Sequence, residues 1–317
     1  MHRPASPLVV GGQVSDFDRR WLKRYGRRGE ADGILLLCFH HAGGSAAAFR
    51  KWPELISPVV EPVAVQLPGR ADRFNEPAFD HMAPLVDALV DVITPLLDRP
   101  FACYGVSMGA HLAWSLALAL RRRAMPMPIQ LFLGCEPAPV HDDGARPWEN
   151  RPDGLEGYLR DLGGTPPEVL AEPELVRALL PTLRADLTAL TTAADRPATP
   201  LDVPIRAFAG TEDPVAPPAL MDGWRAETSA RFELDVIPGG HFFDPAGERR
   251  VIAAIGDDLG RAGPLEVIRR GRERAATTNV EDMYELWKGR VQQAANRARR
   301  GAADASNRGE VTSALRN

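Results

Sequence analysis

Short apolar runs recur along the middle of the chain, and each is closed by Gly, Pro or Asp. They have the length and the branched or aromatic composition of buried strands, and they cover 34–39, 62–67, 101–104, 129–133, 205–209 and 232–237. Segments with apolar residues at helical spacing separate most of them, at Met82–Leu97, Ala110–Arg123 and Met221–Thr228. Because strands that alternate with helices form parallel sheets covered on both faces, the pattern predicts an α/β fold.

The alternation stops between Leu133 and Ile205, where we expect no strand. Residues 137–153 are rich in Pro, Asp and Gly, and two helical patterns follow near 154–162 and 166–192. An insertion between core strands often forms a lid over an active site, although helices that only cover the core would have the same pattern. We place the lid at about 137–200.

Both ends of the chain are more polar than its middle. Residues 1–30 form an Arg-rich leader with a helical pattern near Phe17–Tyr25, the α/β domain covers 31–261, and 262–317 form a charged extension. We expect the extension to contain one amphipathic helix, which packs on its own domain or docks a partner, and a disordered end from about Gly301. The apolar face of that helix is formed by Val280, Met283, Tyr284, Trp287 and Val291.

The composition excludes several classes of function. Hydrophobic residues make up 44% and charged residues 25% of the chain, and the formal net charge of −4 gives no basis for nucleic-acid binding. The N-terminus has no uninterrupted apolar region of a signal peptide, and no apolar run has the length of a membrane span. We therefore expect a cytoplasmic protein without a membrane partner. Cys38, Cys103 and Cys135 are too scattered for a zinc site or a disulfide framework, so we expect buried free thiols and neither metal nor cofactor.

The sequence Gly105-Val106-Ser107-Met108-Gly109 joins the strand at 101–104 to the helix that follows. Small residues suit any tight turn, so the glycines alone decide little. A serine between two glycines at a strand-to-helix joint is also typical of a nucleophile on a strained elbow. Ser107 is therefore a candidate nucleophile, provided that the chain supplies a base and an acid.

Both partners follow later, in the chain order Ser, Asp, His that such elbows use. Asp213 comes after the strand at 205–209, and His241 comes after the strand at 232–237. Open α/β sheets place their sites at the carboxyl ends of parallel strands, where all three residues are expected. Glu212 is the competing acid, and we favour Asp213 because Pro214 promotes a turn there.

Attack on a carbonyl builds negative charge on oxygen, which requires N–H donors fixed in advance. The amide of Met108 is one candidate, because backbone N–H groups at a helix start are free. The amide of Ala42 is the other, in the segment "FHHAGGSAAAF" at 39–49, whose glycines let the backbone approach the site. His40 and His41 are expected to be loop residues, since no cluster of metal-ligand type accompanies them.

Together these segments resemble the type II thioesterases that accompany polyketide synthases and nonribosomal peptide synthetases. The resemblance runs from about 33 to 258 and includes "FHHAGGS", "VQLPGRADR", "YGVSMGAHLAW", "LGGTPPEVL", "LLPTLRADL", "FAGTEDP" and "IPGGHFF". It implies an α/β-hydrolase fold with a helical lid, catalytic Ser107, Asp213 and His241, and oxyanion donors at Ala42 and Met108. It also implies a role in antibiotic biosynthesis, where the substrates are acyl thioesters on the phosphopantetheine arm of an acyl or peptidyl carrier protein, or acyl-CoA.

The chain departs from that family pattern at Val106, where His is usual, at His40, where Pro is usual, and at Ala71, where Glu is frequent. Two alternatives to hydrolysis therefore stay open: an acyltransferase with an amine or hydroxyl acceptor, and a catalytically inactive binding partner.

An acidic carrier protein would dock on Arg121–Arg123 or on the arginines of the extension. The simpler interpretation is that Arg121–Arg123 complement a helix C-terminus.

Overall fold

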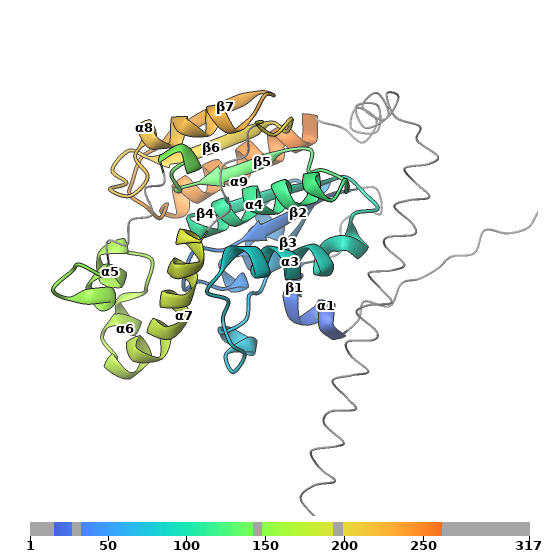
Figure 1. Cartoon of the computed structure of the whole chain (residues 1–317). Helices are drawn as coiled ribbons and strands as arrows, with labels where there is room; N and C mark the ends of the chain where they lie inside the picture. Colours follow the sequence, from blue (N-terminus) through green and yellow to red (C-terminus); the bar gives the residue numbers. More distant parts are fainter. Residues whose placement is uncertain (1–15, 27–32, 142–147, 193–198, 262–317) are drawn as a thin grey trace, which may run out of the picture.

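The computed structural model describes residues 16–26, 33–141, 148–192 and 199–261 (Figure 1). Within these ranges, seven strands form one sheet in the order β1-β3-β2-β4-β5-β6-β7. β1 pairs antiparallel with β3, and every other neighbouring pair is parallel. The strands are β1 (Leu22–Lys23), β2 (Ile34–Phe39), β3 (Val60–Val65), β4 (Phe101–Val106), β5 (Leu131–Gly134), β6 (Ile205–Gly210) and β7 (Phe232–Ile237).

Helices cover both faces of the sheet, as the alternating pattern predicted. In β2, Leu35, Leu37 and Phe39 belong to the core on one face, whereas the alternate residues Ile34, Leu36 and Cys38 belong to the core on the other. In Figure 1, α3 and α4 lie in front of the strands and α9 lies behind them. The helices are α1 (Asp16–Trp21), α2 (Trp52–Leu55), α3 (Met82–Ile93), α4 (Met108–Arg122), α5 (Gly154–Leu162), α6 (Pro167–Leu170), α7 (Pro173–Thr191), α8 (Pro218–Met221) and α9 (Pro245–Arg261).

Helices α5, α6 and α7 form the insertion between β5 and β6, at one end of the sheet (Figure 1). They have their own small apolar cluster, separate from the two cores of the sheet, which consists of Trp148, Leu155, Leu159, Val176, Leu183 and Leu187. The two helical patterns predicted in this interval are thus present, the second divided into α6 and α7. Pro173 starts α7 at a position where its missing N–H costs no hydrogen bond.

Two helical segments differ from the sequence predictions. The long helix α9 was not predicted, although Val251, Ile252, Ile255 and Leu259 lie on its buried face. The predicted helix Met221–Thr228 is wrong: α8 ends at Met221 and 3₁₀ turns cover Asp222–Glu227. Trp224 is buried there and its indole N–H donates to the Glu136 carbonyl oxygen at 2.7 Å, so a distant contact decides the local geometry.

The sheet also begins earlier than the domain boundary that we placed at residue 31. β1 has only two residues, and Leu22 pairs with Val65 while the adjacent Trp21 is buried in the core. Two residues give no periodicity, which is why the sequence analysis assigned this segment to the leader.

The amphipathic helix and disordered end expected within 262–317 lie outside the described residues. No helix in the described ranges combines the length and the apolar character needed to cross a bilayer.

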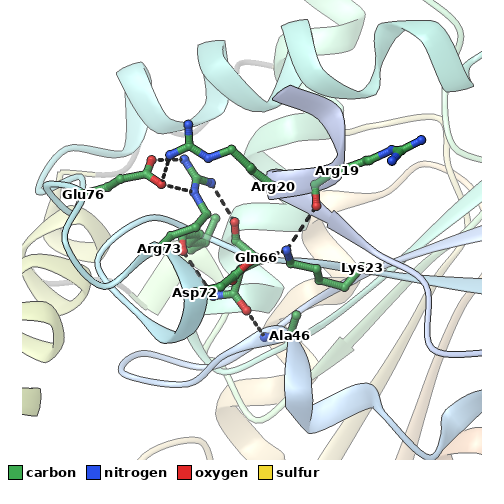
Figure 2. A network of polar contacts seen from close by, with 9 residues as sticks. Arg19, Arg20, Lys23, Ala46, Gln66, Asp72, Arg73 and Glu76 are labelled. Carbon is green, nitrogen blue, oxygen red and sulfur yellow. Dashed lines mark hydrogen bonds and ion pairs between the residues drawn. The ribbon is translucent and has the colours of Figure 1, made fainter. Parts of the chain in front are cut away.

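A network of polar contacts ties this N-terminal segment to the loop after β3 (Figure 2). The Arg73 guanidinium lies 4.1 Å from the centre of the Trp21 ring and donates to the Gln66 carbonyl oxygen at 2.8 Å. Arg73 also pairs with Glu76, which in turn pairs with Arg20. Because Arg73 is buried, its charge depends on these partners for stabilisation.

The same ion pairs lower the pKa of Glu76. The hydrogen bonds from Arg73 are the largest cause. Burial, the next largest, acts in the opposite direction, and the hydrogen bond from Arg20 lowers the pKa further. A carboxylate whose pKa is lower in the folded state stabilises the fold above its unfolded pKa, and this contribution is lost as the pH falls.

We expect Arg73→Ala to lower the free energy of unfolding by about 3 kcal/mol, since it removes a cation–π contact and charge-assisted hydrogen bonds. Urea denaturation at pH 7 measures the loss. The difference from the wild type should shrink as the pH falls below 4.5, the ordinary value for Glu76. Arg177→Ala, which breaks only an exposed pair with Glu174, is the control and should cost little. Equal losses for the two variants would contradict the role of the network.

Candidate active site

Ser107 occupies a strained position between β4 and α4. Its φ of +54° and ψ of −130° lie in a region that residues with a side chain rarely adopt. The flanking glycines are required by space: a Cβ on Gly105 would lie 2.0 Å from the Gly109 carbonyl oxygen, and one on Gly109 would lie 2.2 Å from the Phe39 carbonyl oxygen. The segment thus forms the sharp strand-to-helix turn that the glycine spacing suggested.

The side chains of Ser107, His241 and Asp213 meet in one chain of hydrogen bonds. The Nε2 atom of His241 lies 3.1 Å from the Ser107 hydroxyl oxygen, and Nδ1 lies 3.0 and 3.1 Å from the two carboxylate oxygens of Asp213. A carboxylate only accepts, so Nδ1 carries the proton and Nε2 is left to accept the hydroxyl proton of Ser107. This is the arrangement of a nucleophile with its base and an orienting acid.

The acid is itself held in place by the backbone. Asp213 Oδ1 accepts hydrogen bonds from the amides of Val215 and Ala216 at 2.8 and 3.0 Å. Burial opposes ionisation of Asp213, but the hydrogen bond to His241 and the two amides outweigh it and keep the pKa of Asp213 below its usual value. Asp213 is therefore a carboxylate at neutral pH. Glu212, the competing acid, is exposed, and Asp213 is the one that contacts His241.

The two candidate oxyanion donors lie at the same edge of the sheet. The carbonyl oxygen of His41 accepts a hydrogen bond from the Gly44 amide at 3.0 Å, which closes a turn whose third residue, Gly43, has a φ of +72°. Ala42 is the second residue of this turn. Among the residues that the structure describes, neither the Ala42 N–H nor the Met108 N–H has a hydrogen-bond acceptor. Both donors are thus free for a ligand oxygen.

His40 and His41 belong to this loop and have no metal-ligand environment. Burial lowers the pKa of both imidazoles, so they are neutral. Their Nδ1 atoms donate to the carbonyl oxygens of the next residues, His41 and Ala42, at 2.8 and 2.9 Å. The described residues contain no group of His, Cys, Asp and Glu arranged for a metal ion.

The cysteines are buried free thiols, as predicted. Burial raises the pKa of Cys38, Cys103 and Cys135, so none provides a thiolate nucleophile.

The sequence analysis missed Phe242, whose ring contacts both His41 and His241. A Cβ on Gly164, in the loop before α6, would lie 2.4 Å from this ring, so the insertion contacts the site through Phe242.

Tyr158 of helix α5 interacts electrostatically with the acid, Asp213. Burial raises the pKa of Tyr158 to about 12, and the charges of Glu136 and Asp213 add to the shift. At the end of α4, Arg121 donates to the carbonyl oxygens of Thr199 and Pro200, and Arg123 pairs with Asp87. Both side chains thus contact other segments of the domain.

Comparisons with known proteins show the family of the chain. A family model described as a thioesterase domain matches residues 35–259. The protein named linear gramicidin dehydrogenase LgrE, of Brevibacillus parabrevis, is 36% identical over 245 residues, which are 76% of this chain and 92% of that protein. A probable cadicidin biosynthesis thioesterase of Streptomyces griseus is 34% identical over 242 residues, which are 76% of this chain and 66% of that protein. The solved RedJ thioesterase of the prodiginine pathway in Streptomyces coelicolor is 36% identical with a TM-score of 0.68, over 74% of this chain and 94% of that one.

We expect Asp213→Asn to slow the labelling of Ser107 by a fluorophosphonate probe by about 10³–10⁴-fold. An amide at this position lets Nδ1 of His241 act as acceptor, which places the proton on Nε2 and removes the base. Time courses of labelling, followed by fluorescence on gels, measure the rate.

Glu212→Gln is the matched control, because it makes the same chemical change one residue away on an exposed side chain. It should label at the wild-type rate. If Glu212→Gln is slow and Asp213→Asn is not, the acid is misassigned.

Proposed function

The chain belongs to the thioesterase family and is an enzyme that hydrolyses thioesters, and we propose that Ser107, His241 and Asp213 carry out this hydrolysis on acyl groups bound to a carrier protein. The observation that carries the proposal is the His241 ring, which bridges the Ser107 hydroxyl and the Asp213 carboxylate. His241 takes the proton of Ser107 as the Ser107 oxygen attacks the thioester carbonyl carbon. The oxygen of that carbonyl becomes negative and accepts hydrogen bonds from the Ala42 and Met108 amides.

The tetrahedral intermediate then collapses. The carbon–sulfur bond breaks, the departing sulfur takes the proton from His241, and the acyl group remains as an ester on Ser107. A water molecule gives a proton to the same imidazole and attacks this ester through a second tetrahedral intermediate. Its breakdown returns the proton to the Ser107 oxygen and releases the free acid, and Asp213 stabilises the imidazolium in both halves.

The substrate class and the partner are part of the proposal. The names of the relatives connect them to the biosynthesis of gramicidin, cadicidin and prodiginine. We propose that this chain likewise acts on acyl thioesters of a phosphopantetheine-bearing carrier protein, in the cytoplasm. The word dehydrogenase in one relative's name is not carried over, because the sequence has no G-x-G-x-x-G segment of dinucleotide-binding turns.

The insertion is proposed to be the lid of the site. Its contacts support this role: Gly164 lies against Phe242 beside His241, and Leu183 of α7 lies against Gly43 of the turn that carries Ala42. A lid at this position would cover the acyl group while it is bound to Ser107.

Ser107→Ala should abolish turnover of acyl-carrier protein, acyl-CoA and acyl-N-acetylcysteamine, with a loss in kcat of at least about 10⁴-fold. Release of free thiol gives the rate, and mass spectrometry of the wild type should detect the acyl group on Ser107. Ser115→Ala makes the same chemical change at a buried position of α4, the helix that follows Ser107, and should keep full activity.

The products separate the alternatives. Free acid as the sole product in the presence of amines and alcohols supports hydrolysis, whereas esters or amides would assign an acyltransferase. Wild-type protein that neither releases thiol nor reacts with a fluorophosphonate would be an inactive binding partner.

A further inference from the structure

The turn that carries Ala42 is held at its central peptide, between Ala42 and Gly43, from both sides. The Ala42 carbonyl oxygen accepts a hydrogen bond from Nδ1 of His41 at 2.9 Å. The Gly43 amide donates to Oδ2 of Asp186 at 2.7 Å. A central turn peptide fixed at both its C=O and its N–H has only one orientation available. The direction of the neighbouring Ala42 N–H depends on the same turn.

Asp186 belongs to helix α7 and lies 143 residues along the chain from Gly43. Its carboxylate is held by Arg70, whose two terminal nitrogens donate to Oδ2 and Oδ1 at 2.6 and 2.8 Å. The remaining nitrogen of the Arg70 guanidinium, Nε, donates to the Pro68 carbonyl oxygen at 3.0 Å. Arg70 and Asp186 are 5% and 2% exposed, so this ion pair is screened little by solvent.

Two further contacts bring α7 to the same place. A Cβ on Gly43 would lie 3.3 Å from a methyl carbon of Leu183, so this leucine packs directly on the turn. The Thr182 hydroxyl donates to the Gly69 carbonyl oxygen at 2.7 Å, in the loop that carries Arg70. One stretch of α7 therefore contacts both the loop after β2 and the loop after β3.

We propose that Asp186 is a positioning residue of the active site, which reaches from helix α7 to fix the turn that aims the Ala42 N–H, with Arg70 fixing its carboxylate in turn. The proposal rests on the proposed function, because it needs Ala42 as an oxyanion donor. It makes the placement of α7 a condition for catalysis, so the lid and the oxyanion pocket act as one unit. Asp186 touches neither the nucleophile nor its base.

A simpler role for the pair is to anchor α7 to the domain. The two roles predict different kinetics. An anchor acts on stability, and once the protein is folded its loss leaves the chemical step unchanged. A positioning residue acts on the transition state, so its loss lowers kcat while KM changes little.

The test compares wild type, Asp186→Ala and Asp186→Asn with acyl-N-acetylcysteamine and with the fluorophosphonate probe. We expect Asp186→Ala to lower kcat and the labelling rate by about 10²-fold with KM nearly unchanged, since one oxyanion donor is misplaced. Asp186→Asn keeps an oxygen that accepts from Gly43 and should lose about 10-fold, because the bidentate pair with Arg70 is broken. Arg70→Lys keeps the positive charge but removes the planar guanidinium that donates to both carboxylate oxygens. Its loss of kcat and of labelling rate should therefore resemble that of Asp186→Asn.

Glu61→Gln is the matched control for a buried ion pair. Glu61 is 6% exposed and pairs with Arg24 and Arg99. It lies near the start of β3, whereas the Arg70 loop follows the end of that strand. It should lower the melting temperature as the Asp186 variants do, yet keep the wild-type kcat and labelling rate per folded molecule.

The outcomes separate the two proposals. If Ser107→Ala is inactive while Asp186→Ala loses only stability, with kcat and labelling unchanged, Asp186 is an anchor and this inference is wrong while the proposed function stands. If Ser107→Ala keeps turnover, the proposed function is wrong, and the inference that depends on it is wrong as well. A proportional loss of kcat in Glu61→Gln would also overturn the inference, because it would trace the effect to stability alone.

Discussion

The close approach of helix α4 to the sheet is the constraint on which the rest of this structure depends. The first turn of α4 lies so near β4 and β2 that neither Gly105 nor Gly109 has space for a Cβ. The chain must therefore turn sharply between strand and helix, and the residue at the turn, Ser107, takes a positive φ. This conformation costs free energy of the order of 1–3 kcal/mol, which the buried packing of α4 offsets. It also leaves the Met108 amide free at the helix start.

The parallel sheet then brings distant segments to that point. The loops after β2, β3, β4, β6 and β7 all leave the same edge, because parallel strands share their direction. Each polar group at the edge is held by another that is itself held: His241 by Asp213, Asp213 by the amides of Val215 and Ala216, and the Gly43 amide by a carboxylate of α7. Side chains fixed in this way need little reorganisation when charge develops on a bound substrate.

Sequence analysis predicted much of this fold and failed in identifiable places. The core strands gave strong signals because both of their faces are buried, as in β2, which lies between two apolar clusters. It missed β1, since two residues carry no period, and it extended a helix through 221–228, where the burial of Trp224 imposes 3₁₀ turns. Of the candidate site, it selected Ser107, Asp213 and His241 from chain order and strand ends. It gave no role to Asp186 and Arg70, although both lie in quoted family motifs.

The sequence by itself determined the order of the strands along the chain, the glycines around Ser107 and the loops on which the polar residues lie. These features follow from local sterics and from the period of apolar residues, which act over a few positions. The tertiary structure decided which acid contacts His241, that Trp21 belongs to the core, and that Asp186 reaches a turn 143 residues away. Such contacts depend on the packing of whole elements against one another, and no local pattern along the chain encodes the distance between two side chains that meet only after folding.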